Sequence, residues 1–235
     1  MSGVVRGYSW LIWDADGTLF DYDRAEAAAL QTTFGELGLP WREGALRAYR
    51  RINARIWREF ELGEITQERL RTRRFELLFG ALQTSCDPEL FSLAYLAHLA
   101  QGTELVDGAE EVVRSLYGRV GMLILTNGLS EVQRPRVERS AIRNYIADVV
   151  ISEEVGAAKP DPAIFDVAFA RMGWPHKTQV LMVGDSLTSD IAGANAYGID
   201  ACWFNPAGKE RQAGLSIRYE IARLDELLGI VGLAG

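Results

Sequence analysis

The sequence contains few of the residues that form zinc sites, disulfides or histidine-based active sites. Its 235 residues include two cysteines, Cys86 and Cys202, which lie far apart and form no CxxC pair. A zinc site or a disulfide framework is therefore not expected. Two histidines leave little material for histidine-based catalysis. Lysine is also scarce, with three lysines against 22 arginines, so each lysine is conspicuous.

The sequence also lacks an excess of positive charge and lacks long apolar runs. There are 25 Lys+Arg against 32 Asp+Glu, a net charge of −7, which disfavours a nucleic-acid polymer or an anionic membrane as partner. Runs such as Met122–Leu125 are far too short to span a bilayer. Asp14 interrupts the first apolar stretch, so no secretory signal is expected. The sequence favours a cytoplasmic protein and leaves room for a small phosphate ester in a locally positive pocket.

Short apolar runs that end in polar residues or glycine are typical of strands buried on both faces of a parallel sheet. Helical patterns lie between the later runs, and this alternation predicts βαβ units in a doubly wound α/β sheet. The runs are Tyr8–Trp13, Val120–Leu125, Val149–Ile151, Val180–Val183 and Ala201–Phe204.

About eighty residues after Phe20 have helical patterns throughout. Asp23 and Glu26 resemble a capping box, and Asp87-Pro88 is typical of a helix start. The block is too large for a crossover between two strands. We therefore predict a helical subdomain over residues 21–100, inserted into an α/β core made of residues 1–20 and 101–235.

The first predicted strand leads directly into Asp14-Ala15-Asp16-Gly17-Thr18. Carboxylates at positions i and i+2 of an extended chain point to the same side. Open α/β sheets bind ligands at the carboxyl ends of their strands, which is where this pair lies. Taken alone, the pair is equally typical of a solvated acidic loop.

Three further strand ends contain polar side chains. Thr126, Asn127 and a glycine follow the second strand, where a hydroxyl, an amide and a helix N-terminus form a cradle for an anion. Lys159 precedes a proline in the loop after the third strand, and Asp185 and Asp190 follow the fourth. Individually, Thr126 and Asp190 are also typical helix caps, and a lone lysine is typical of a solvated surface.

Together these residues resemble the four motifs of the haloacid dehalogenase (HAD) superfamily: DxDGT, a strand-end threonine, a lysine before proline, and GDxxxxD. The resemblance covers essentially the whole chain. It implies a HAD-like, Rossmann-like fold with the helical block as a cap, and a magnesium-dependent phosphatase. It also implies that Asp14 is the nucleophile that forms an aspartyl-phosphate, and that Asp16 acts first as general acid and then as general base.

The same resemblance implies the remaining roles in the site. Mg²⁺ would neutralise charge between an anionic nucleophile and an anionic substrate. The implied metal ligands are Asp14, the Asp16 carbonyl and Asp185. The implied phosphate-binding residues are Thr126, Asn127 and Lys159. Asp190 is implied to support the metal's waters or Lys159.

Two features separate reactions within the superfamily. Dehalogenases resemble the first motif but lack the second carboxylate, here Asp16, because a halide leaves without a proton. Phosphonatases need a cap lysine, and residues 21–100 contain none. A phosphate ester is therefore the expected substrate. A phosphosugar phosphatase or mutase stays open as an alternative, with a haloacid dehalogenase or a non-catalytic scaffold less favoured.

Four stretches resemble the pyrimidine 5′-nucleotidase branch of the superfamily: residues 13–16, 125–128, 151–160 and 202–205. This resemblance implies nucleoside 5′-monophosphates as substrates. Aromatic residues of the helical block are candidates to stack on a base, although such spacing is also typical of a helix core; they are Trp41, Tyr49, Trp57 and Phe60. Ten arginines fall between Arg42 and Arg74; most of them are predicted to lie on a solvated helix face, and one or two are candidates to contact a nucleotide.

Overall fold

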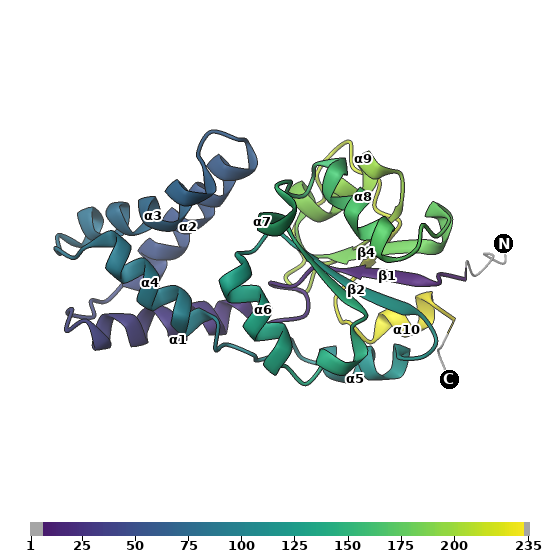
Figure 1. Ribbon diagram of the computed structural model, residues 1–235, viewed down its shortest axis with the longest axis horizontal. Helices are drawn as coiled ribbons and strands as arrows, with labels where there is room; N and C mark the ends of the chain where they lie inside the picture. The colour runs from purple at the N-terminus through teal and green to yellow at the C-terminus, as the bar shows by residue number, and fades with distance from the viewer. Residues whose placement is uncertain (1–6, 233–235) are drawn as a thin grey trace. The chain divides into compact units, whose positions relative to one another are not determined.

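The computed structural model describes residues 7–232 and divides the chain into two compact units (Figure 1). The sheet unit contains the chain up to Tyr22 and from Thr103 onward. The helical unit contains Asp23–Gly102.

The sheet unit is built on six parallel strands in the order β3-β2-β1-β4-β5-β6. This arrangement confirms the doubly wound α/β fold. Because all strands run the same way, their carboxyl ends share one edge, and β1 is flanked there by β2 and β4. The strands are β1 (Trp10–Trp13), β2 (Gly121–Thr126), β3 (Asp148–Ile151), β4 (Val180–Gly184), β5 (Asp200–Phe204) and β6 (Tyr219–Ile221).

Helices cover both faces of this sheet, as Figure 1 shows. Successive strand residues point to opposite faces, so Leu11 and Trp13 pack into one core and Ile12 into the other. The first core includes residues of α5 (Ala109–Leu116), α6 (Ser130–Arg139) and α10 (Glu226–Ile230). The second includes residues of α8 (Pro162–Arg171) and α9 (Ala192–Tyr197). Shorter turns are η1 (Arg143–Tyr145), α7 (Ser152–Val155), η2 (Lys177–Gln179) and η3 (Leu187–Ile191).

The helical unit consists of α1 (Tyr22–Glu36), α2 (Ala45–Glu61), α3 (Gln67–Leu82) and α4 (Pro88–Leu99). Aromatic rings fill its core; Tyr49, for example, stacks on Phe75 with 5.7 Å between ring centroids. The predicted start of α4 is confirmed, because the Asp87 side chain accepts a hydrogen bond from the Glu89 N–H and proline occupies the first turn.

Two sequence-based interpretations of local structure are corrected. The capping box is wrong, because α1 already begins at Tyr22 and places Asp23 and Glu26 inside the helix. Glu26 is buried and accepts a 2.7 Å bond from the Arg50 Nε instead. The edge strand β6 was not predicted. In the described range 7–232, helices that combine the length and apolarity needed to cross a bilayer are absent.

Candidate active site

The first predicted motif lies at the carboxyl end of the central strand. Asp14 directly follows β1, and its backbone N–H donates to the Val183 carbonyl of β4 at 2.9 Å. The chain then turns back, with Gly17 at a φ of 86° and its N–H bonded to the Phe20 carbonyl. A Cβ at Gly17 would also lie 3.1 Å from the Asp185 carboxyl carbon, so glycine suits both the turn and the close approach.

Lys159 lies at the centre of the polar cluster with its side chain 1% exposed. Its Nζ donates to Asp14 Oδ1 at 2.6 Å and to the Leu125 carbonyl at 2.6 Å, and it pairs with Asp190 Oδ1 at 2.7 Å. Asn127 fixes the lysine backbone by two bonds: its Nδ2 donates to the Lys159 carbonyl, and its Oδ1 accepts from the Lys159 N–H. The second and third strand ends are thereby tied to the first.

The fourth motif leaves β4 and enters the π-helical turn η3, a distortion that is frequent at functional sites. This turn brings Asp190 back onto the strand end, where its Oδ2 accepts from the Ser186 N–H at 3.0 Å. The buried Trp203 of β5 donates from its indole nitrogen to the Asp185 carbonyl at 3.0 Å. Backbone and side-chain bonds thus hold both aspartates in place.

Asp14, Asp185 and Asp190 offer carboxylate oxygens that all lie within 4.8 Å of one another. Oxygen ligands of this kind are the ones that Mg²⁺ prefers in proteins. The donor set therefore fits the ion that the resemblance implies.

Burial and mutual repulsion perturb the charges of this cluster. Burial, reinforced by Asp190, raises the pKa of Asp14 well above its ordinary value, although Lys159 opposes the shift. Burial and Asp190 likewise raise the pKa of Asp185 to about 6. For Lys159, burial works against the charge, but Asp14 and Asp190 outweigh it and raise the pKa of the ammonium. One lysine therefore does not compensate the carboxylates, and a cation at this place would relieve their repulsion.

Two further predicted residues, Thr126 and Asp16, are held by contacts of their own within the sheet unit. Thr126 ends β2, is buried, and its Oγ1 accepts from the Gly128 N–H at 3.1 Å. The Asp16 carboxylate is bound by two side chains of α6, Gln133 and Arg136. The sequence does not predict either contact, because helical spacing alone does not distinguish these two residues from the exposed polar residues of α6. Trp203 lies in the stretch 202–205 noted for its resemblance, but its bond to Asp185 was not predicted.

The aromatic candidates of the helical unit divide into core and surface. Tyr49 is fully buried and belongs to the core. Trp57 and Phe60 are half-buried and meet edge to face with ring centroids 5.9 Å apart. Trp41, 42% exposed, packs against Phe34. Base stacking stays a prediction for the exposed rings.

The arginines of α2 and α3 are not all on a solvated face. Arg74 is fully buried, donates to Asn53 at 3.1 Å and lies over the Phe75 ring. Arg50 pairs with Glu26. Arg74 is therefore an exception to the solvated face predicted for most of these arginines, because buried polar and aromatic partners compensate its charge.

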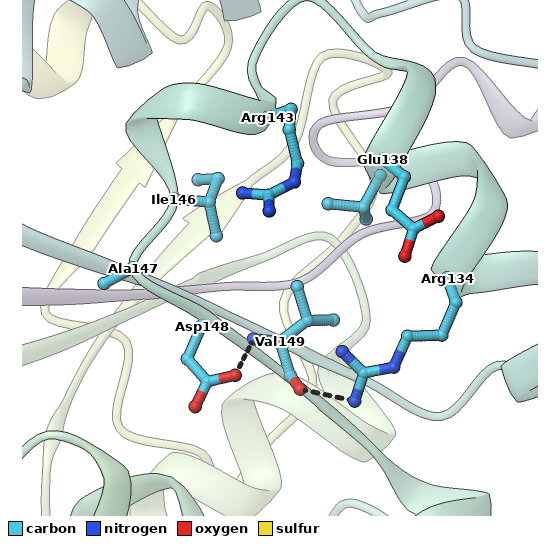
Figure 2. Close-up of a pocket in the computed structure, with 8 residues that line it drawn as sticks. Arg134, Glu138, Arg143, Ile146, Ala147, Asp148 and Val149 are labelled. Carbon is cyan, nitrogen blue, oxygen red and sulfur yellow. Dashed lines mark hydrogen bonds between the residues drawn. The ribbon is translucent and has the colours of Figure 1, made fainter.

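A separate pocket of about 130 Å³ lies in the sheet unit between α6, η1 and β3 (Figure 2). Arg134 and Arg143 are among the residues that line it, and Arg134 donates to the Val149 carbonyl at 3.2 Å. Glu138 and Asp148 also line it, so its charge is mixed. None of the residues predicted for the site lines this pocket.

Comparison with known proteins gives one consistent family. Residues 8–198 match the model of haloacid dehalogenase-like hydrolases. Pyrimidine 5′-nucleotidase YjjG of Escherichia coli is 34% identical over 94% of this chain and 96% of its own, and pyrimidine 5′-nucleotidase PynA of Streptococcus pneumoniae is 32% identical over 94% of both. A crystal structure of the putative HAD-hydrolase YfnB of Bacillus subtilis, bound to magnesium, superposes with a TM-score of 0.91 at 33% identity, covering 96% of this chain and 99% of that one.

Proposed function

Because the chain belongs to the haloacid dehalogenase-like hydrolases, we propose that it is a magnesium-dependent phosphatase of small phosphomonoesters, with pyrimidine nucleoside 5′-monophosphates as its substrates. The observation that carries the proposal is the cluster of Asp14, Lys159, Asp185 and Asp190 at the carboxyl ends of adjacent parallel strands. The two pyrimidine 5′-nucleotidases among its relatives support the substrate class.

In the proposed reaction, Asp14 is the nucleophile. Its carboxylate oxygen forms a bond to phosphorus while the bond between phosphorus and the ester oxygen breaks, which gives an aspartyl-phosphate. Asp16 donates a proton to the departing oxygen, so the nucleoside leaves as an alcohol. Lys159 holds the Asp14 carboxylate in place, because its Nζ donates to Oδ1 at 2.6 Å.

The second half of the reaction returns the enzyme to its starting state. Asp16, now ionised, accepts a proton from water as the water oxygen bonds to phosphorus, and the bond to Asp14 breaks to release inorganic phosphate. Thr126, Asn127 and Lys159 bind the phosphoryl oxygens and compensate their negative charge. Both halves use one carboxyl as acid and then as base, so protons balance over the cycle.

Asp14, the Asp16 carbonyl and Asp185 would hold Mg²⁺, with Asp190 supporting Lys159. When bound, the ion supplies positive charge that lets an anionic nucleophile approach an anionic phosphate. The chain's own contribution is to keep Asp14 buried and aligned, because Lys159 and the β4 backbone contact it from two directions.

Phosphate release tests the proposal. The purified protein should hydrolyse p-nitrophenyl phosphate with Mg²⁺ and lose the activity in EDTA. A panel of pyrimidine and purine nucleoside 5′-monophosphates and sugar phosphates, each with and without a sugar bisphosphate activator, then assigns the substrate. Absence of phosphate release under every condition would refute the phosphatase. Preference for sugar phosphates, or transfer without net phosphate release, would replace the nucleotidase by a phosphosugar phosphatase or a mutase.

A further inference from the structure

Both oxygens of the Asp16 carboxylate accept bonds from helix α6. The Gln133 Nε2 donates to Oδ2 at 2.6 Å, and the Arg136 Nη1 forms an ion pair with Oδ1. Gln133 is 1% exposed and the Arg136 side chain is fully buried, whereas the Asp16 side chain is 26% exposed. A buried glutamine and a buried arginine therefore point from the interior to one carboxylate at the surface of the site.

The local structure fixes the two donors. They lie three residues apart on α6, so they share one face of the helix. The Arg136 guanidinium lies 4.7 Å from the centroid of the buried Phe20 ring, at the end of the Asp16 turn. A Cβ at Gly128 would lie 2.4 Å from the Gln133 Nε2, so the glutamine occupies space that this glycine leaves free. Helix, turn and strand end together restrict where the amide and the guanidinium sit.

We propose that Gln133 and Arg136 are positioning residues that hold the Asp16 carboxylate as the base of the water step; this inference rests on the proposed function. Both partners donate N–H groups, one to each oxygen of the carboxylate, so the Asp16 side chain is held at two points from one face of α6. In the proposed cycle, this carboxylate takes the proton from water. Two donors on two oxygens remove the rotational freedom of the carboxylate before water attacks.

A purely structural role accounts less well for this arrangement. Burying a guanidinium costs several kcal/mol unless its partners compensate it, and apolar residues of similar volume often replace buried ion pairs without loss of stability. Here, beside the Phe20 ring, a compensating partner is the Asp16 carboxylate, at which the proposed reaction needs a fixed acceptor. Loss of either donor should therefore slow hydrolysis of the aspartyl-phosphate more than its formation.

Burst kinetics with p-nitrophenyl phosphate separate the two steps. The nitrophenolate leaves readily without a proton, so its first release reports phosphorylation of Asp14, and steady-state release reports the water step. The variants are Gln133→Met and Arg136→Met, with Arg139→Met as the matched control, because Arg139 is exposed on the same helix. General-base catalysis contributes about 10²–10⁴-fold, so partial loss of positioning should lower steady-state turnover by roughly 10-fold or more.

The expected result is a nitrophenolate burst close to one per active site in the Gln133 and Arg136 variants, then slow turnover with phosphorylated protein visible by mass spectrometry. The control should match the wild type. If burst rate and steady state fall together and no phosphorylated protein accumulates, the proposal is overturned. Gln133→Met removes only one neutral donor, so it tests the proposal even where Arg136→Met fails to fold.

An Asp16→Asn background separates this inference from the proposed function. If the donors act through Asp16, adding Gln133→Met to Asp16→Asn should slow turnover no further. A second slowing of the same size as in the wild-type background contradicts the positioning role while the phosphatase stands. If the wild type releases no phosphate at all, or Asp14→Asn retains full activity, the proposed function itself fails.

Discussion

Replacing Lys159 with methionine should destabilise the sheet unit and do so in a pH-dependent way. The Nζ of Lys159 contacts Asp14 Oδ1 and the Leu125 carbonyl at 2.6 Å and Asp190 Oδ1 at 2.7 Å. Methionine keeps much of the side-chain volume but removes every one of these contacts. Two buried carboxylates and one buried carbonyl then lose a partner that water cannot easily replace.

The size of the effect follows from these contacts. Removing one partner of a buried ion pair costs about 3–5 kcal/mol of the free energy of unfolding. The pKa of Asp14 is already raised by burial and by Asp190, and Lys159 is what opposes that shift. Without the lysine, the carboxyl takes up a proton more readily, and this protonation limits the loss. At about 2–4 °C per kcal/mol for a domain of this size, Tm should fall by roughly 10 °C.

Thermal unfolding in EDTA across a pH series measures the effect. Protonation relieves the uncompensated carboxylates, so the deficit of the variant should grow as pH rises and shrink as pH falls. Lys177→Met is the control, because Lys177 is exposed and its Nζ donates to the Tyr197 carbonyl away from the cluster. A Tm loss no larger than that of the control, or one that is independent of pH, would show that Lys159 does not compensate these carboxylates.

Three further substitutions test the site. Asp14→Asn should abolish phosphate release while preserving the fold, as checked by circular dichroism, and residual turnover above background would remove Asp14 as nucleophile. Thr126→Val should lower kcat by roughly 10²–10³-fold, by analogy with the loss of one transition-state donor, and an unchanged kcat would exclude its hydroxyl from that role. The pKa of Asp185 is about 6 in the folded protein, above its unfolded value, so in EDTA its contribution to stability is present at low pH and is lost as pH rises through 6. Asp185→Asn should remove that part of the Tm-versus-pH curve together with most of the Tm gain on adding Mg²⁺, and a curve and gain identical to those of the wild type would contradict the assignment.

The sheet could be predicted from sequence because parallel strands are buried on both faces and therefore appear as unbroken apolar runs. The run at Val180–Val183 corresponds to β4, all of whose residues are buried. The edge strand β6 lacks this signal, because it has three residues and Glu220 at its centre is exposed. Because only one side of this short strand is buried, its apolar pattern is too short to be recognised as a strand.

Charged residues inside helices limit how much of the remaining structure can be predicted from the sequence. Arg136 and Arg74 look like their exposed neighbours in sequence, because helical spacing alone does not distinguish a solvated arginine from one with a buried partner. Their partners, Asp16 and Asn53, are 120 and 21 residues away in the chain. Glu26 failed as a capping residue for the same reason, since it pairs with Arg50 on the next helix. Strand-end motifs can be predicted to lie together, because the parallel direction of the strands by itself brings their carboxyl ends to one edge of the sheet.

The charge balance of the cluster links its stability to its chemistry. Asp14 and Asp190 share one lysine, and Asp185 lies beside them with a raised pKa. In the proposed reaction Asp14 is the nucleophile and must be ionised to attack phosphorus, yet burial favours its protonated form. Added positive charge at the three carboxylates therefore does two things at once: it stabilises the folded site and it shifts Asp14 toward the reactive form. A site that was compensated fully by its own residues would be more stable but would gain less from such a cation. In the proposed mechanism, the excess of carboxylates is therefore the feature that makes the reaction depend on a cation.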